Sequence, residues 1–234
     1  MAVTGSRVIV ALDFPNERDV LAFVDSIDAH SCRLKIGKQL FTACGPQLVR
    51  RLVDAGHDVF LDLKFHDIPN TVGEACRAAT DLGVWMMNVH ALGGSRMMEA
   101  AQKAVDGSDS LLIAVTLLTS ADQQELDELG LPGTPESLVL RLASLAERAG
   151  LDGVVCSAEE GPVLRKQLAA NFLLVTPGIR LADDSKGDQK RVLTPGHAVA
   201  NGASYLVIGR SITQATDPAA VLQRINRELD SVTA

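Results

Sequence analysis

The feature that most constrains the fold is a regular alternation of short apolar runs with amphipathic segments along the whole chain. Short apolar runs between turn residues are typical of buried parallel strands, and apolar residues at i, i+3, i+4 and i+7 mark one face of a helix. This pattern predicts strands at residues 8–13, 33–37, 59–65, 85–91, 111–118, 153–157, 173–179 and 205–209. An amphipathic segment follows each of them.

Turn and cap residues support the same division of the chain. Gly56 is expected to end the second helix, Thr194 with Pro195 to begin the seventh, and Asp217 with Pro218 to begin the last. Eight strand–helix units without a linker favour a (β/α)8 TIM barrel over a doubly wound open sheet. No GxGxxG motif follows the first strand, which weakens the open sheet further. We predict a single (β/α)8 barrel catalytic domain spanning residues 1–234.

Composition limits the classes of partner. The net charge of -7 argues against a general nucleic-acid or anionic-membrane binder, although a few focused cations could still hold an anionic small molecule. There is neither an 18-residue apolar run nor a basic segment followed by an apolar one at the N-terminus, so we expect no membrane span and no signal peptide. The cysteines form no CxxC or Cys/His cluster, which predicts reduced thiols in a cytoplasmic protein and no zinc site.

Two unlike charges interrupt the apolar strand at residues 59–65. Because strand side chains alternate between faces, Asp62 and Lys64 are expected to point one way and Leu61, Leu63 and Phe65 the other. Burying two charges is costly unless they are paired. The pair could be a structural ion pair or part of a working site.

Polar residues recur at the ends of the predicted strands, which is where barrels of this kind carry their active sites. They are Asp13, Lys35, Asp62, Lys64, Asn88, His90, Thr119, Ser120, Arg180, Gly209 and Arg210. The loops after strands seven and eight commonly bind phosphate in barrels, so Gly209, Arg210 and the amide of Gln189 are candidate phosphate ligands. The alternative for Arg210 is a surface side chain at a strand end.

The charges suggest a chemistry. A lysine flanked by carboxylates stays protonated, which suits Lys64 to deliver a proton to a carbanion as carbon dioxide departs. Asp62 would repel an anionic group on the substrate. From charge alone, magnesium binding by Asp13, Asp62 and Asp67 is an open alternative.

Several motifs together resemble one family. They are VALD at 10–13, RLKIGKQLF at 33–41, DVFLDLKFHDIPNT at 58–71, NVHALGG at 88–94, AVTLLTS at 114–120, DGVVCS at 152–157, VTPGIR at 175–180, GDQ at 187–189 and VIGR at 207–210. Over nearly the entire chain the sequence is similar to the orotidine 5′-monophosphate decarboxylase family. The resemblance implies decarboxylation of orotidine 5′-monophosphate to uridine 5′-monophosphate in pyrimidine biosynthesis, without a metal or an organic cofactor.

The resemblance also implies residue roles. Lys64 would protonate the pyrimidine carbon, Asp62 would face the departing carboxylate, Lys35 would complete the charged array and contact the ribose, and Asp13 would accept a ribose hydroxyl. Asp67 and Thr71 would reach the partner's site in a homodimer with composite active sites. The pyrimidine would contact Thr119 and Ser120, and the remaining substrate and phosphate contacts would be Arg180, Gln189, Gly209 and Arg210.

Some alternatives stay open beside these roles. Thr71 with Glu74 also fits a capping box at the start of a helix. The polar segments at 119–135 and 180–189 are long enough to serve as lids. His66 and His90 lie in matching motifs and are expected to be structural. A magnesium-dependent sugar-phosphate decarboxylase or aldolase, and a non-catalytic nucleotide-binding barrel, remain alternative functions.

Overall fold

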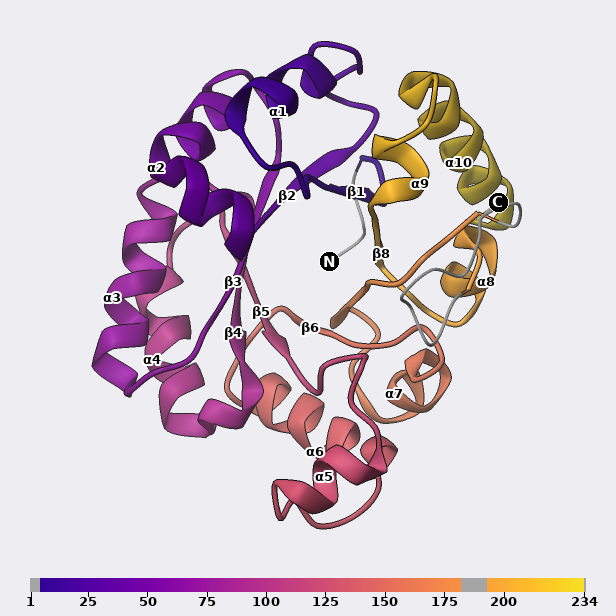
Figure 1. Cartoon of the computed structure of the whole chain (residues 1–234). Coiled ribbons are helices and arrows are strands. Elements are labelled where there is room, and N and C mark those ends of the chain that lie inside the picture. The colour runs from indigo at the N-terminus through magenta and orange to yellow at the C-terminus, as the bar shows by residue number, and fades with distance from the viewer. Residues whose placement is uncertain (1–4, 182–192, 234) are drawn as a thin grey trace.

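A computed structural model describes residues 5–181 and 193–233 and confirms the predicted barrel. Eight parallel strands close in chain order, with β8 pairing back onto β1 (Figure 1). The strands are β1 (Val8–Ala11), β2 (Arg33–Gly37), β3 (Val59–Phe65), β4 (Met86–His90), β5 (Leu111–Val115), β6 (Gly153–Val155), β7 (Leu173–Thr176) and β8 (Tyr205–Ile208). Several predicted strands were one to three residues too long, because the apolar runs continue past the last residue that pairs with a neighbouring strand.

Helices surround the barrel on its outside (Figure 1). They are α1 (Glu17–Val24), α2 (Lys38–Asp54), α3 (Pro69–Thr80), the 3-10 turn η1 (Ala91–Gly93), α4 (Ser95–Val105), α5 (Gln123–Glu128), α6 (Pro135–Arg148), α7 (Gly161–Gln167), α8 (Pro195–Ala200), α9 (Arg210–Thr213) and α10 (Pro218–Thr233). The short helices α5 and α9 were not predicted. Within the part of the chain that the structure describes, no helix is both long and apolar enough to cross a membrane.

The period of two along each strand separates an inner layer from an outer one. The inner layer fills the barrel with bulky side chains, among them Ile9, Phe60, Met86, Ile113, Val175 and Tyr205. The outer layer packs the sheet against the helices, and Leu61 belongs to it, with Leu63 and Phe65 packed against it. The predicted faces of β3 are therefore confirmed, and Asp62 and Lys64 are left facing the inside of the barrel.

A buried arginine closes the end of the barrel at which the strands begin. The guanidinium carbon of Arg33 lies 4.3 Å from the ring centroid of Trp85 and 5.1 Å from that of Tyr205, within the range of cation–π attraction. Its Nε is 3.2 Å from a carboxylate oxygen of Asp58. Because this end is plugged, ligand access to the interior is from the opposite end, where the strands finish.

The helix ends test several sequence predictions. Gly56 follows the last residues of α2 with φ of 86°, a left-handed conformation that ends a helix and that glycine adopts without steric cost. Asp217 caps α10 as predicted, since its carboxylate accepts from the amide of Ala220 at 2.9 Å. Thr194 precedes α8 as predicted, but its side chain makes no capping hydrogen bond.

The capping box proposed for Thr71 is wrong. Helix α3 begins at Pro69 with Ile68 as its N-cap, so Thr71 already lies inside the first turn. Proline is well tolerated at the first position of a helix because its missing N–H would have no intrahelical partner there. A capping role for Thr71 therefore no longer competes with the substrate contact expected for it.

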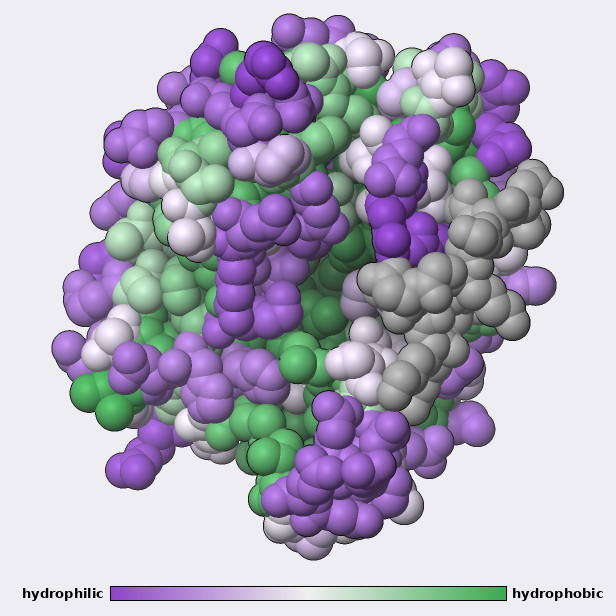
Figure 2. Space-filling model, viewed as in Figure 1, coloured by the Kyte–Doolittle hydropathy of each residue, from purple (hydrophilic) through white to green (hydrophobic). Residues whose placement is uncertain are grey.

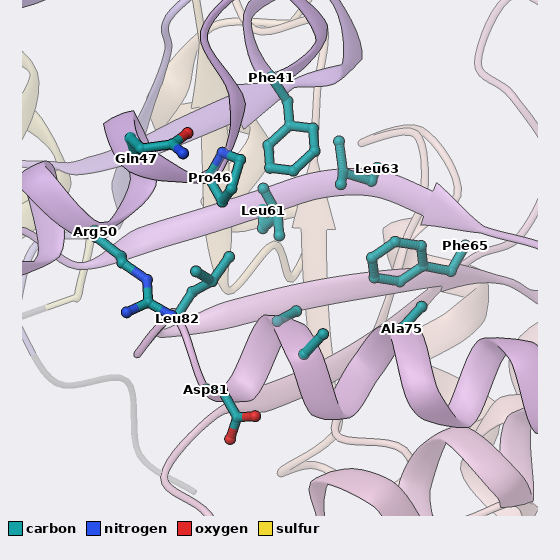
Figure 3. A pocket seen from close by; sticks show the side chains of 12 residues that line it. Phe41, Pro46, Gln47, Arg50, Leu61, Leu63, Phe65, Ala75, Asp81 and Leu82 are labelled. Carbon is teal, nitrogen blue, oxygen red and sulfur yellow. The ribbon is translucent and has the colours of Figure 1, made fainter.

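An apolar cleft of about 750 Å³ lies outside the barrel, between α2, β3 and α3. Figure 3 shows Leu61, Leu63 and Phe65 of β3 between Phe41 and Pro46 on one side and Ala75 on the other. Helix α2 is kinked at Gly45, where φ is 69°, directly before Pro46. The small alanine side chains of α3 leave the outer face of β3 incompletely covered.

Candidate active site

The site begins with an irregularity at the end of β3. Lys64 has φ of 53°, the only non-glycine residue in the described chain with positive φ. At the same place the register between β3 and β4 shifts, between Leu61 and Phe65. The backbone amide of Lys64 donates to the side-chain oxygen of Asn88 on β4 at 2.8 Å instead of to a neighbouring strand carbonyl. Lysine rarely adopts this left-handed backbone conformation, so the residues around Lys64 must stabilise it.

Asp62 is the centre of a charged cluster. Its Oδ1 lies 2.5 Å from Nζ of Lys64 and accepts from the amide nitrogen of Asn88 at 2.7 Å. Its Oδ2 lies 3.3 Å from Nζ of Lys35, and that ammonium lies 3.8 Å from Oδ1 of Asp13. Five side chains, from β2, β3, β4 and the end of β1, therefore form one continuous network.

The network keeps Asp62 ionised. Burial on its own would raise the pKa of this carboxyl, but the ammonium groups of Lys35 and Lys64 and the hydrogen bonds from Lys64 and Asn88 together lower the pKa below its usual value. The side chain of Asp62 is only 13% exposed. At neutral pH the site therefore presents a fixed carboxylate between two ammonium groups.

Two adjoining cavities meet at this cluster. The larger, of about 680 Å³, is lined among others by Asp13, Gly209, Arg210 and Arg180. The smaller, of about 190 Å³, is lined by Lys64, Thr119 and the apolar side chains Phe60, Val115, Leu117, Leu118 and Val155. Lys35, Asp62, Pro177 and Val207 line both. Figure 2 shows the hollow at the centre of this face, with hydrophilic side chains along part of its border.

The larger cavity brings together residues from both ends of the chain. β8 lies beside β1, so a Cβ on Gly209 would stand 3.9 Å from a carboxylate oxygen of Asp13 and 3.6 Å from Cβ of Ala11. Arg210 is the first residue of α9, and Arg180 follows β7 with its amide donating to the carbonyl of Leu193 at 3.2 Å. The loops after β7 and β8 thus place two guanidinium groups at one side of the cavity.

Several predicted site residues fall elsewhere. Thr119 lines the small cavity, whereas Ser120 is exposed and lines neither cavity. Asp67 and Thr71 are also exposed and line neither, and the Asp67 carboxylate accepts from the amide of Ile68 at 2.6 Å. Gln189 lies outside the described residues.

The sequence reading missed contributors that carry no charge. Gly37, at the end of β2, stands where a Cβ would come within 3.2 Å of Nζ of Lys35. Gln39, Thr213 and Gln214 line the larger cavity. The position of Thr213 and Gln214 could have been expected from the sequence, because barrels commonly place a short extra helix after strand eight. Nothing in the sequence singles out Gln39.

Two histidines stand beside the cluster without entering it. The rings of His66 and His90 stack with centroids 5.5 Å apart, and neither histidine lines the two cavities. Burial, followed by the charges of His66, Lys64 and Lys38, lowers the pKa of His90 to about 4. His90 is therefore neutral at physiological pH, which suits the structural role predicted for it.

The carboxylates are not gathered as a metal site. Within residues 5–181 and 193–233, no group of three or more His, Cys, Asp or Glu side chains is placed to hold a metal ion. Both oxygens of Asp62 face ammonium groups, while the Asp67 carboxylate accepts from the backbone amide of Ile68. The three-aspartate magnesium site considered from the sequence does not form within these residues.

A (β/α)8 barrel with a lysine–aspartate network and two cavities at the C-terminal ends of its strands has the architecture of a barrel enzyme. Comparison with known proteins makes the assignment specific. Residues 6–225 match the model of the Orotidine 5'-phosphate decarboxylase / HUMPS family. The chain therefore belongs to that family.

Relatives match over nearly their full lengths. The orotidine 5'-phosphate decarboxylase of Nitrosomonas europaea is 59% identical over 226 residues, covering 97% of this chain and 98% of that protein. That of Nitrosospira multiformis is 58% identical, covering 97% and 95%. The crystal structure of orotidine 5'-phosphate decarboxylase from Lactobacillus acidophilus superposes with a TM-score of 0.86 at 38% identity, covering 95% of this chain and 98% of that one.

Proposed function

We propose that this protein decarboxylates orotidine 5′-monophosphate to uridine 5′-monophosphate in pyrimidine biosynthesis, with Lys64 as the proton donor and without a metal or organic cofactor. The observation that carries the proposal is the position of the Lys64 ammonium, 2.5 Å from an ionised Asp62 on the wall of the small cavity. Family membership supplies the substrate, because the relatives are orotidine 5'-phosphate decarboxylases.

The two cavities suit the two ends of such a substrate. The phosphate would lie in the larger cavity against Arg180 and Arg210, since guanidinium groups bind phosphate oxygens in a bidentate manner. Gln189 is expected to join them. The pyrimidine would enter the small cavity beside Thr119, with Ser120 as a further expected contact. The ribose would then lie between them at Asp13 and Lys35.

The chemical step needs only the residues of the cluster. The bond between the ring carbon and the carboxylate breaks, carbon dioxide leaves, and the electron pair stays on the ring carbon. Lys64 donates a proton to that carbon and is left as a neutral amine, which water reprotonates. An ammonium group beside the developing carbanion also stabilises its charge before the proton moves.

Asp62 has a separate part in this step. Its carboxylate is ionised and would face the substrate carboxylate in the same small cavity. Repulsion between the two anions is relieved when carbon dioxide departs, so it favours the transition state over the bound substrate. Asp62 also holds both ammonium groups, which fixes the direction from which the proton arrives.

We further propose a homodimer with composite active sites, to which the partner's Asp67 and Thr71 contribute. Both residues are exposed on this subunit and line neither of its cavities. Beside them the ends of three successive strands carry exposed apolar side chains: Ile68 at 67%, Leu92 at 39% and Leu118 at 48%. Large apolar side chains exposed at the ends of neighbouring strands support an interface here. A second copy of the chain would cover them and bring Asp67 to the opposite site.

The test of the function is turnover of orotidine 5′-monophosphate by protein treated with a chelator, followed as loss of the substrate's absorbance. Unchanged turnover after chelation is the expected result. Complete loss on chelation, with recovery on adding Mg²⁺, would support a metal-dependent barrel decarboxylase or aldolase instead. Nucleotide binding without any turnover would favour a non-catalytic nucleotide-binding barrel.

The state of the cysteines is informative about the cellular compartment of the protein. Cys32, Cys44, Cys76 and Cys156 are all free thiols, and burial raises the pKa of Cys32 and of Cys76 to about 12. Buried thiols of this kind are unreactive and have no part in the proposed chemistry. Four unpaired cysteines support the proposal of a cytoplasmic enzyme, since reducing compartments keep thiols free.

A further inference from the structure

Asn88 is the most buried polar group beside the charged cluster, and the chemistry proposed above gives it no part. It lies on β4 with no exposed surface, and its strand neighbours Met87 and Val89 point outward into the helix layer. It lines neither cavity, so it does not touch a ligand bound there. Both of its hydrogen bonds run instead to residues of the cluster.

The partners of Asn88 fix the orientation of its amide. The backbone N–H of Lys64 can only donate, so it must face the amide oxygen, which it does at 2.8 Å. An ionised carboxylate can only accept, so Asp62 must face the amide NH₂ group, which it does at 2.7 Å. Among neutral side chains of this size, only an amide satisfies a donor and an acceptor placed in this way.

The bond to Lys64 holds an unusual backbone. Lys64 has φ of 53°, where side chains other than glycine are disfavoured, and the register of β3 and β4 shifts at this point. The displaced amide of Lys64 finds its acceptor on Asn88. The same side chain therefore holds the lysine at its backbone and the aspartate at its carboxylate.

We propose that Asn88 is a positioning residue that sets the distance and direction between the Lys64 ammonium and the reacting ring carbon, and holds the Asp62 carboxylate in place. The inference rests on the proposed function, because the quantity that Asn88 controls is proton delivery from Lys64. Displacing a catalytic group by about 1 Å is expected to cost on the order of a hundredfold in rate.

The direct test is Asn88→Leu, which keeps the number and branching of the side-chain heavy atoms and removes both hydrogen bonds. We expect kcat to fall by about 10- to 100-fold, while the dissociation constant of uridine 5′-monophosphate changes by less than about 3-fold, because Asn88 does not reach the ligand. The acid limb of the kcat profile should also move to higher pH. A hydrogen bond to the charged form lowers a carboxyl pKa, so removing it raises the pH at which Asp62 protonates.

A matched control comes from the neighbouring strand end. Thr116 is equally buried, and its hydroxyl donates to the carbonyl of Val155 at 3.0 Å without touching the cluster. Thr116→Val also removes one buried hydrogen bond, so it should lower the melting temperature while leaving kcat within about 3-fold and the acid limb in place. A purely structural role for Asn88 would make the two variants behave alike.

Asn88→Asp keeps the shape and supplies a test if the leucine variant does not fold. The introduced carboxyl still accepts from the Lys64 amide, but once ionised it cannot donate to Asp62 and repels it. The ratio of variant to wild-type kcat should therefore fall as pH rises. A flat ratio, or an unchanged kcat and acid limb in a folded Asn88→Leu protein, would overturn the inference while leaving the proposed function intact. Lack of turnover in the wild-type protein would instead contradict the function on which the inference rests.

Discussion

Replacing Lys64 with alanine gives the most direct measure of the proposed chemistry. The change removes the ammonium group but leaves Asp62 with its contacts to Lys35 at 3.3 Å and to Asn88 at 2.7 Å. Alanine is no more strained than lysine at φ of 53°, so the backbone should keep its path. The fold and most of the site are thus expected to survive.

The size of the effect follows from the charge and the proton. An ammonium group roughly 3.5 Å from a developing carbanion contributes about 5 kcal/mol at an effective dielectric constant of about 20, which is between three and four powers of ten in rate. General acid catalysis by a positioned side chain contributes about 10²- to 10⁴-fold. Because one group supplies both effects, they overlap, and we expect kcat to fall by about 10⁴-fold or more.

Binding should respond far less than turnover. Lys64 lines only the small cavity, whereas Arg180 and Arg210 line the larger one. We therefore expect Lys64→Ala to bind uridine 5′-monophosphate within about 10-fold of wild type, measured by calorimetry. Lys38→Ala is the matched control, because Lys38 is an exposed cation at the start of α2 that lines neither cavity. It should keep kcat within about 3-fold.

Turnover is followed as loss of substrate absorbance in chelator-treated protein, with circular dichroism to show that the variant is folded. A folded Lys64→Ala protein with near-normal kcat would refute the assignment of Lys64 as proton donor. Equal losses in Lys64→Ala and Lys38→Ala would show that net charge, and not the position of one ammonium, controls the rate.

Two further predictions follow from the same structure. Mixing Asp67→Asn subunits with Lys64→Ala subunits should restore about one quarter of the wild-type site activity, because random exchange makes half the dimers mixed and each mixed dimer holds one intact composite site. The free energy of unfolding, measured with a denaturant, should fall as pH drops below about 6.5. The reason is that two histidines have lowered pKa values: that of His90 is lowered to about 4, and burial lowers that of His57. The Nδ1 atom of His57 has no hydrogen-bond partner among the described residues.

The sign of the pH effect follows from proton binding. Between about pH 4 and pH 6.5 the unfolded chain carries protons on these histidines that the folded chain does not, so acid favours unfolding. His57→Gln should make the fall less steep, and an unchanged slope would contradict the role of His57. For the mixing experiment, proven subunit exchange without recovered activity would argue against a site built from two chains.

The sequence identified most of the residues of the candidate site, but not the distances between them. The alternation of side chains along a strand was enough to place Asp62 and Lys64 together and to send Leu61 to the opposite face. Strand and helix order was enough to indicate a barrel, and polar residues at strand ends were enough to indicate its mouth. The motifs that resemble the orotidine 5′-monophosphate decarboxylase family then indicated an expected substrate. These signals are local in the chain, so they can be read without coordinates.

The contacts between strands were decided only by closure of the barrel. Pairing of Gly37 with Asp62 brings Lys35 to Asp62, and pairing of β8 with β1 brings Gly209 to Asp13. The left-handed backbone at Lys64 and its hydrogen bond to Asn88 lie at a register shift between β3 and β4, and no residue pattern in the sequence predicts that shift. A sequence specifies which face a side chain takes, because that depends on its own strand. The distance to a side chain on another strand depends on register and shear, which exist only once the sheet has closed.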